Sequence, residues 1–243
     1  MHKNRSTKEP PLGKLILVRH GKTVLNSLDD EERLRGWLDI PLDEQGFREA
    51  REAADRVAQH PVQRIYCSDL HRARQTADAV VRATQAPIVY TSELRPWNLG
   101  SLTGERVKDI LPTLLQLEVD LEMPAPGGES FLAFYTRYSQ KLMELLAIAA
   151  DSPGCIVAVT HHRNVLAAPT ILQGGDKTKI PVRGGPKTGD LLWMEQKAGK
   201  WNLRIEGASQ SDTIPSGVLN SPVVQTGSSP LAGSTATSDP GAD

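Results

Sequence analysis

The alternation of short apolar runs with longer helix-patterned segments is the feature that most constrains the fold of this chain. Runs rich in apolar and β-branched residues and bounded by turn residues predict strands at 15–18, 64–67, 87–91, 155–159, 190–195 and 201–205. Elsewhere, apolar residues recur at helical spacing and predict helices at 44–59, 70–81, 108–121, 130–150 and 164–172. We expect Ser68 or Asp69 to cap the second of these helices.

This alternation predicts an α/β fold: a three-layer sandwich with a mostly parallel central sheet and helices on both faces. The run at 155–159 is the most apolar and should be the central strand. Aromatic residues at helical spacing between 130 and 150 indicate core packing rather than a ligand site. In open sheets of this kind, ligands bind beyond the carboxyl ends of the strands.

Composition divides the chain of 243 residues into three parts. Residues 1–13 form a polar N-terminal segment, and residues 14–207 carry the apolar periodicity of one folded domain. Residues 208–243 are rich in Ser, Thr, Gly and Pro and contain no aromatic residue. Because such a segment cannot bury enough apolar surface to offset its ordering entropy, we predict a disordered tail.

Charge and cysteine content argue against several partners. A net charge of -1 gives no reason to expect binding to nucleic acid or to an anionic membrane. No run of about 18 apolar residues predicts a transmembrane helix, and the N-terminal segment lacks the apolar core of a signal peptide. We interpret Cys67 and Cys155 as buried thiols. The expectation is a soluble, cytoplasmic protein whose oligomeric state stays open.

Histidine and arginine residues follow three of the predicted strands at or near their carboxyl ends. These residues are Arg19 and His20, His71 and Arg72, and His161, His162 and Arg163. Because the carboxyl ends of neighbouring parallel strands meet at one edge of a sheet, we expect these side chains to face one another. A lone histidine more often has a structural role than a catalytic one, whereas such a cluster of histidine and arginine favours a functional site.

These residue types suit phosphoryl transfer. Arginine presents a planar fork of donors that matches phosphate oxygens and stays charged at neutral pH. Its charge also disfavours protonation of a neighbouring imidazole, so His20 would keep a lone pair for attack on phosphorus. The carbonyl of Gly21 can hold the proton of the second ring nitrogen. Since phosphoryl transfer asks mainly for positioning and charge stabilisation, we expect His20 to be the nucleophile.

Several separate motifs follow one another along the chain. They are L-V-R-H-G-K-T at 17–23 with Asn26, R-G-W-L-D-I-P-L at 35–42 with Gly46, C-S-D-L-H-R-A-R-Q-T-A at 67–77, G-G-E-S at 127–130 and V-T-H at 159–161. Together they resemble the histidine phosphatase superfamily, also called phosphoglycerate mutase-like. The resemblance covers about residues 15–192, makes 14–207 a domain of this type, and implies a phosphomonoesterase acting on a small phosphorylated substrate.

The resemblance also implies roles for individual residues. His20 and His161 would be the catalytic residues, with His20 passing through a phosphohistidine intermediate. Arg19, Arg72 and His161 would clamp the transferred phosphoryl group, and Asn26 would be a further donor. The resemblance implies neither a metal nor an organic cofactor.

One position departs from the family pattern. Family members usually carry a glutamate, the proton donor to the leaving group, in a motif of the form L-x-E-x-x-x-G-x-x-x-G. The matching segment here, 94–104, keeps both glycines but holds Pro96 at the acid position. Proline has no proton to give. The candidates for a replacement acid are Glu93, Glu129, Asp190 and His162.

Other interpretations stay open at this stage. The same fold can serve a phosphoglycerate mutase-type phosphotransferase, or a non-catalytic module that binds a phosphate ligand or a protein. The acidic stretch at 28–33 is either a solvated loop or a lid that disfavours highly anionic substrates. The basic, glycine-rich stretch at 177–187 favours the opposite interpretation, because it could bind a second anionic group of the substrate, remote from the reacting phosphate. The physiological substrate is therefore left open.

Overall fold

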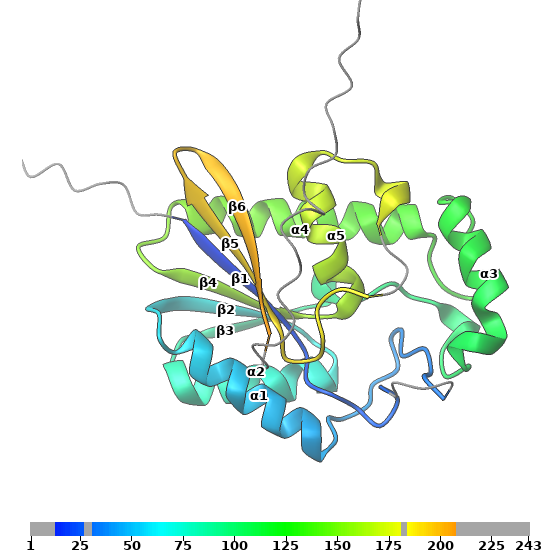
Figure 1. Ribbon diagram of the computed structural model, residues 1–243, viewed down its shortest axis with the longest axis horizontal. Helices are drawn as coiled ribbons and strands as arrows, with labels where there is room; N and C mark the ends of the chain where they lie inside the picture. Colours follow the sequence, from blue (N-terminus) through cyan, green and yellow to red (C-terminus); the bar gives the residue numbers. More distant parts are fainter. Residues whose placement is uncertain (1–12, 27–30, 181–183, 208–243) are drawn as a thin grey trace, which may run out of the picture. The chain divides into compact units, whose positions relative to one another are not determined.

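The computed structural model of the protein describes residues 13–26, 31–180 and 184–207 (Figure 1). The tail predicted at 208–243 lies outside the described residues, as do residues 1–12 of the N-terminal segment. The same is true of residues 27–30 in the acidic stretch and residues 181–183 in the basic stretch.

The described strands form one mixed sheet of six strands in the order β3-β2-β4-β1-β5-β6. They are β1 (Lys14–Arg19), β2 (Val62–Ser68), β3 (Ile88–Thr91), β4 (Cys155–Thr160), β5 (Leu191–Lys197) and β6 (Lys200–Glu206). The pairs β1–β4, β4–β2 and β2–β3 are parallel. Strand β5 pairs antiparallel with both β1 and β6. The prediction of a mostly parallel sheet is confirmed, and β4 is central, between β2 and β1.

Helices cover both faces of the sheet (Figure 1). Helices α1 (Glu44–Val57) and α2 (His71–Thr84) pack on one face, and α4 (Phe131–Ala150) and α5 (His162–Gln173) pack on the other. The two-residue period of β1 explains how one strand serves both layers, because Leu15 and Leu17 join the core on the α4 side. Ile16 and Val18 join the core on the α1 side. Helix α3 (Val107–Val119) adds apolar residues to the α4 side.

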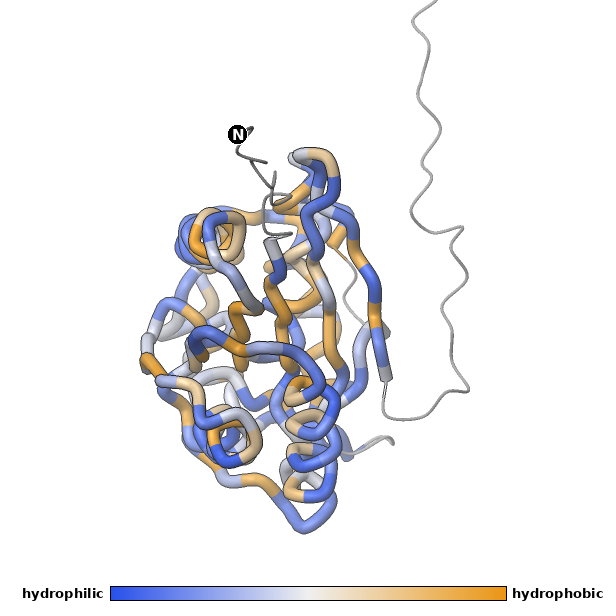
Figure 2. The backbone as a smooth tube through the Cα atoms, turned by 90° about the vertical axis from the view of Figure 1, so that its left-hand side faces the viewer, coloured by the Kyte–Doolittle hydropathy of each residue, from blue (hydrophilic) through white to orange (hydrophobic). Residues whose placement is uncertain are grey.

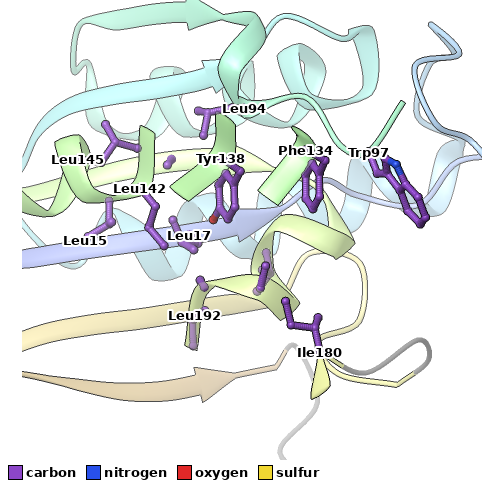
Figure 3. Packing of buried hydrophobic residues seen from close by; sticks show 14 of the residues in the cluster. Leu15, Leu17, Leu94, Trp97, Phe134, Tyr138, Leu142, Leu145, Ile180 and Leu192 are labelled. Carbon is purple, nitrogen blue, oxygen red and sulfur yellow. The ribbon is translucent and has the colours of Figure 1, made fainter. Parts of the chain in front are cut away.

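The core on the α4 side is built on the aromatic stripe that the sequence indicated. Phe134, Tyr138, Leu142 and Leu145 are fully buried. Figure 3 shows these side chains reaching from α4 toward β1, where Leu17 lies among them. Burying each large apolar side chain contributes roughly 1.5–3 kcal/mol relative to leaving it exposed. Figure 2 shows hydrophobic residues concentrated along the strands in the middle of the fold.

Local details differ from the sequence predictions at a few positions. The predicted cap of α2 by Ser68 or Asp69 is wrong, because Leu70 occupies the cap position and no side chain caps the helix. Helix α5 begins at His162, two residues before the predicted start, with His161 at its cap position. Short 3-10 turns at Ser92–Leu94, Gly100–Leu102 and Lys177–Lys179 were not predicted.

The two cysteines agree with the interpretation from the sequence. Cys67 and Cys155 are both free and buried. None of the helices in the described ranges combines the length and the hydropathy that crossing a lipid bilayer requires.

Candidate functional site

The carboxyl ends of β1, β2 and β4 meet at one edge of the sheet. Arg19 pairs with Thr160 in the last register position of β1 and β4. The backbone then continues this pairing, since the amide of His20 donates to the carbonyl of Thr160 at 3.0 Å. As a result the rings of His20 and His161 lie side by side, with 5.1 Å between their centroids. We call Arg19, His20, Arg72 and His161 the strand-end pocket.

The ring of His20 is held in one tautomer. Its Nδ1 lies 2.8 Å from the carbonyl oxygen of Gly21, which can only accept, so Nδ1 carries the proton. Its Nε2 lies 3.3 Å from Nε of Arg72, which can only donate, so Nε2 keeps its lone pair. Burial lowers the pKa of His20 well below its ordinary value, and the charges of Arg72 and Arg19 lower it further. His20 is therefore a neutral imidazole with its lone pair on Nε2.

A close contact between Gly21, which follows β1, and helix α1 fixes the turn after His20. A Cβ atom on Gly21 would overlap the carbonyl oxygen of Gly46 in the first turn of α1. The amide of Gly21 donates to the hydroxyl of Thr76 at 3.1 Å, and this hydroxyl donates to the carbonyl of Arg72 at 2.8 Å. The glycine at this position is thus required by space, and the turn is tied to helix α2.

Arg72 is fully buried and joins three segments of the chain. Besides its contact with His20, its two terminal nitrogens donate to the carbonyls of Leu38 at 2.7 Å and Gly36 at 2.9 Å. Burial, and next the charge of Arg35, lower the pKa of Arg72 to about 9. At neutral pH it remains a guanidinium cation that is locked in place beside the nucleophile candidate.

His161 and Arg19 each bring a buried nitrogen without a partner among the described residues. His161 contacts the hydroxyl of Ser68 through Nε2 at 2.8 Å, and its Nδ1 is unpartnered. Arg19 donates through one terminal nitrogen to the carbonyl of Pro186 at 2.5 Å, and its Nε is unpartnered. Because leaving a buried polar atom without a partner costs about 1–3 kcal/mol, a polar ligand that pairs with these two nitrogens would be stabilised here.

The surroundings of these two residues are positively charged. Burial lowers the pKa of His161 well below its ordinary value, and Arg72 is the next cause. Burial, and then Arg35, lower the pKa of Arg19 to about 10. Buried cations that repel one another favour a ligand of opposite charge, so the strand-end pocket is suited to an anion.

Asn26 lies in the turn that follows β1 and is buried. Its side-chain oxygen accepts from the amide and from the hydroxyl of Thr23, both at 3.0 Å. These bonds hold the side chain by its oxygen and leave its Nδ2 amide as the donor. His71, the remaining histidine after β2, is exposed and lies outside the cluster of buried groups.

Arg35 lies directly before Gly36, whose carbonyl accepts from Arg72, and was absent from the predicted site residues. Its side chain is 14% exposed, and its charge is among the causes that lower the pKa of His20, His161 and Arg72. The sequence offered one signal, the position of Arg35 directly before Gly36-Trp37 in the second motif. No periodicity could show that this loop folds back onto the strand ends.

Two of the proposed replacement acids are engaged elsewhere. Glu93 is half exposed and forms an ion pair with Lys141 at 3.1 Å, and Lys141 is the main cause of a lowered pKa for Glu93. Glu129 pairs with Arg137 at 2.7 Å and accepts from the backbone amide of Asn98 at 2.9 Å. Both carboxylates bind groups outside the strand-end pocket and stabilise the loops that carry them.

The other two candidates lie beside Arg19. The carboxylate of Asp190 accepts from the backbone amide of Lys187 at 2.6 Å, and its charge raises the pKa of Arg19. His162 contacts the carbonyl of Gly184 through Nε2 at 2.7 Å. Burial, and then the charge of Arg19, lower the pKa of His162 to about 4, so it is neutral at physiological pH.

Pro96 is buried beside Trp37, whose indole ring is stacked against the guanidinium groups of Arg95 and Arg137. Its carbonyl accepts from Nε1 of Trp37 at 2.8 Å and from Arg137 at 3.3 Å. The guanidinium of Arg95 stacks on Trp37 at 4.6 Å and forms a bidentate ion pair with Asp69. We call this cluster the Pro96 rim; it consists of Trp37, Asp69, Arg95, Pro96, Glu129 and Arg137.

Within the described ranges, no group of three or more His, Cys, Asp or Glu residues is arranged to hold a metal ion. The arrangement of the strand-end pocket suits a tetrahedral anion instead. It combines a neutral imidazole nucleophile, two guanidinium groups that flank it, and a second neutral imidazole.

Comparisons with known proteins find a family model and relatives that this chain matches. Residues 15–207 match the model of the histidine phosphatase superfamily (branch 1). The metal-independent phosphoserine phosphatase of Arabidopsis thaliana is 31% identical over 170 residues, which are 66% of this chain and 68% of that protein. The probable phosphoglycerate mutase GpmB of Yersinia pestis (strain Pestoides F) is 31% identical over 149 residues, 59% of this chain and 68% of that protein.

A solved structure shows the same fold. The native structure of a mycobacterial glucosyl-3-phosphoglycerate phosphatase superposes with a TM-score of 0.68 at 26% identity, covering 82% of this chain and 100% of that chain. The same mycobacterial protein in complex with inorganic phosphate superposes with a TM-score of 0.63 at 25% identity, covering 80% of this chain and 98% of that chain.

Proposed function

Because this chain belongs to the histidine phosphatase superfamily, we propose that it is a phosphomonoesterase that acts on small phosphorylated substrates through a phosphohistidine at His20. The observation that carries the proposal is the ring of His20. It is buried and neutral, with its proton fixed on Nδ1 by Gly21 and its lone pair on Nε2 beside a guanidinium. This is the state that a nitrogen nucleophile needs.

In the first step, the Nε2 lone pair of His20 attacks the phosphorus atom of the phosphate monoester. The bond between phosphorus and the leaving oxygen breaks, and its electron pair stays on that oxygen. Nε of Arg72, 3.3 Å from Nε2, would exchange its contact with His20 for a phosphoryl oxygen. Arg19 Nε and His161 Nδ1, the two buried nitrogens without partners, would take further oxygens.

In the second step, water attacks the phosphorus atom of the phosphohistidine. The phosphorus–nitrogen bond breaks, its electron pair returns to Nε2, and inorganic phosphate leaves. The mycobacterial relative binds inorganic phosphate, which supports a pocket of this class. We further propose that the protein works inside the cytoplasm and needs no organic cofactor. It would also need no metal, a property that the name of the Arabidopsis relative states for that enzyme.

The substrate range should reflect Pro96, which we propose stands where relatives carry a general acid. General acid catalysis typically contributes 10²–10⁴-fold, and the contribution is largest for poor leaving groups. We therefore expect turnover of aryl phosphates such as p-nitrophenyl phosphate to exceed that of glycerol phosphate by about 10²-fold or more. Steady-state phosphate release from both substrates, with His20→Ala as the blank, measures this. Comparable rates on the two substrates, both requiring His20, would reveal a replacement acid.

A gain-of-function pair sharpens this test. Pro96→Glu places a carboxyl group at the proposed acid position, and Pro96→Gln is its uncharged control with nearly the same volume. We expect the Glu variant to hydrolyse glycerol phosphate at least about 10-fold faster than the Gln variant. Aryl phosphate turnover should differ little between them. Equal rates on glycerol phosphate would mean that this position does not face the leaving group.

The match to a phosphoglycerate mutase favours one second candidate, transfer of the phosphoryl group to another hydroxyl. A mutase would keep the phosphoryl group until an acceptor arrives, whereas a phosphatase releases it to water. Adding an alcohol acceptor during turnover separates the two. Phosphorylated acceptor as the main product would support the mutase, and inorganic phosphate alone would support the phosphatase.

A further inference from the structure

The direction of the Arg72 guanidinium is set by two backbone carbonyls. Its terminal nitrogens donate to the carbonyls of Leu38 at 2.7 Å and Gly36 at 2.9 Å. The third nitrogen, Nε, lies beside the nucleophile, 3.3 Å from Nε2 of His20. Because the guanidinium is a rigid plane, the place of the two carbonyls decides where Nε points.

These carbonyls belong to residues 36–42, a segment that we call the Arg72 loop. Arginine has a long side chain with several rotatable bonds, so its own rotamer does not fix the carbonyls that it binds. One further contact of the loop is with the Pro96 rim, where Trp37 donates to the carbonyl of Pro96 at 2.8 Å. A contact with helix α2, which carries Arg72, is needed to fix the loop relative to the guanidinium.

Asp39 makes this contact. Its carboxylate accepts from the backbone amide of His71 at 2.6 Å. His71 is the first residue of α2, and Leu70 before it offers no side-chain acceptor. The first amides of a helix have no partner within the helix, and they favour a negative charge. The Arg72 loop is thus joined by a charge-assisted hydrogen bond to the residue directly before Arg72.

A second contact holds the far end of the loop. Gln75, one helical turn after His71, accepts through Oε1 from the amide of Leu42 at 2.7 Å. Of the two contacts, the one made by Asp39 is next to a carbonyl that binds the guanidinium, since Asp39 directly follows Leu38. Loss of Asp39 should therefore shift this carbonyl, while Gln75 and the indole at the Pro96 rim keep the loop attached.

Resting on the proposed function, we infer that Asp39 is a positioning residue for phosphoryl transfer, which fixes the Arg72 loop to α2 and thereby directs Nε of Arg72 toward the phosphoryl oxygen. Asp39 is exposed and binds the helix rather than the pocket. It acts through the carbonyl of Leu38 and takes no part in the chemical step.

This role predicts a kinetic effect that is large relative to the effect on stability. A displacement of about 1 Å by a substitution far from the chemistry can cost up to about 10²-fold in rate. Since Arg72 would serve the transferred phosphoryl group, aryl and alkyl phosphates should lose activity by one common factor. Vanadate, which mimics five-coordinate phosphorus, should bind more weakly by a similar factor, because transition-state analogues report complementarity to the transition state.

The test removes the hydrogen bond from each side in turn. Asp39→Ala removes the acceptor, and Asp39→Asn keeps an acceptor oxygen without the charge. His71→Pro removes the donor, because proline has no amide proton and is well tolerated at the first position of a helix. The extended backbone of Leu70 is the conformation that a following proline requires.

The measurements are kcat/KM for p-nitrophenyl phosphate and glycerol phosphate, the inhibition constant of vanadate, and the melting temperature. Asp120→Ala is the matched control, since this exposed carboxylate also accepts from backbone amides, those of Glu122 and Met123 at 3.2 Å, at the end of α3. The double variant Asp39→Ala/His71→Pro completes a cycle, and His20→Ala defines the blank.

We expect Asp39→Ala and His71→Pro each to lower kcat/KM by about 10-fold on both substrates and to raise the vanadate inhibition constant by about 10-fold. Their melting temperatures should stay within about 5 °C of the native value. Asp39→Asn should recover most of the activity. The double variant should lose no more than either single variant, because both remove the same bond. Asp120→Ala should keep native kinetics.

Native kcat/KM in Asp39→Ala or His71→Pro would overturn the inference and leave the proposed function intact. So would additive losses in the double variant, or a loss confined to glycerol phosphate, which would place the effect on the leaving group. If Asp39→Ala does not fold, His71→Pro decides by the same criteria. Native protein without His20-dependent turnover would overturn the proposed function and this inference together.

Discussion

The strand-end pocket and the Pro96 rim are both rich in arginine, yet they use it in opposite ways. In the rim, Arg95 and Arg137 each pair with a carboxylate at 2.6–2.7 Å and stack on Trp37. In the pocket, Arg19 Nε and His161 Nδ1 are buried without a partner among the described residues. A region whose charges are paired internally stabilises a loop, whereas unpartnered nitrogens beside buried cations and a neutral imidazole favour an anion.

Substitution of Arg72 should give the largest loss of activity and is the first test of this difference between the pocket and the rim. Arg72→Met should lower kcat/KM for p-nitrophenyl phosphate by about 10³-fold, because it removes the cation beside Nε2 of His20. It also leaves the carbonyls of Gly36 and Leu38 without their donor, which should lower the melting temperature. Arg72→Lys should recover stability in part and activity hardly at all, since an ammonium cannot reproduce the planar fork. Native-like kinetics in either variant would contradict the account.

His161 tests whether an unpartnered nitrogen in the pocket serves the ligand. His161→Gln should lower kcat/KM by about 10²-fold and weaken inhibition by inorganic phosphate, because Nδ1 is the nitrogen left for an oxygen of the substrate. Ser68→Ala is the matched comparison, since it removes the contact at Nε2, together with a long hydrogen bond from the amide of Leu70 at 3.5 Å, and keeps the imidazole. A larger loss in Ser68→Ala than in His161→Gln would show that positioning by Ser68 matters more than the imidazole.

The pH dependence of stability tests the neutral state of the pocket. Burial lowers the pKa of His20 and His161 well below its ordinary value, so the unfolded chain binds these protons first as the pH falls. The free energy of unfolding should therefore fall below about pH 6.5, by up to about 1.4 kcal/mol per pH unit for each histidine. Above this pH the contribution is fully present.

Calorimetry at pH 7.5 and 5.5 measures this effect. The native protein should lose more stability between the two values than a variant carrying His20→Gln and His161→Gln. His71→Gln, at an exposed position, is the control and should keep the native slope. Equal slopes in all three proteins would mean that the pocket histidines are charged in the fold.

The smallest kinetic effect is expected in the carboxylates away from the pocket. Glu93→Gln and Glu129→Gln should change kcat/KM on any substrate by less than about threefold, since Lys141 and Arg137 already engage these carboxylates. Glu129→Gln should cost about 1 kcal/mol of stability, because it weakens the pair with Arg137. A hundredfold loss of activity at unchanged stability would identify the residue as the acid.

Most of the fold could be predicted from the spacing of apolar residues within each segment. Each strand and long helix has a period that its own residues display, and the centre of the sheet followed from the apolar run of β4. The antiparallel hairpin of β5 and β6 was harder, because strand direction depends on the turn at Ala198-Gly199, where both residues have positive φ. The short 3-10 turns have no period to detect.

The site also has a part that the sequence could predict and a part that it could not. The residues of the strand-end pocket were found because parallel strands bring their carboxyl ends together, a rule that needs no knowledge of loops. Arg35 was missed because its place depends on a loop that folds back over the strands, and only the contacts of Gly36 and Leu38 with Arg72 reveal it. Sequence spacing likewise could not predict that Glu129 binds Arg137 and the amide of Asn98 within the rim.

The most direct test of the central claim is to trap the phosphoenzyme. The native protein and His20→Ala are mixed with a labelled phosphate donor, quenched, and treated with acid or with base. The account predicts a label on the native protein that acid removes and base leaves, as expected for a phosphorus–nitrogen bond, and no label on His20→Ala. An equal label on both proteins, or a label that survives acid, would contradict it.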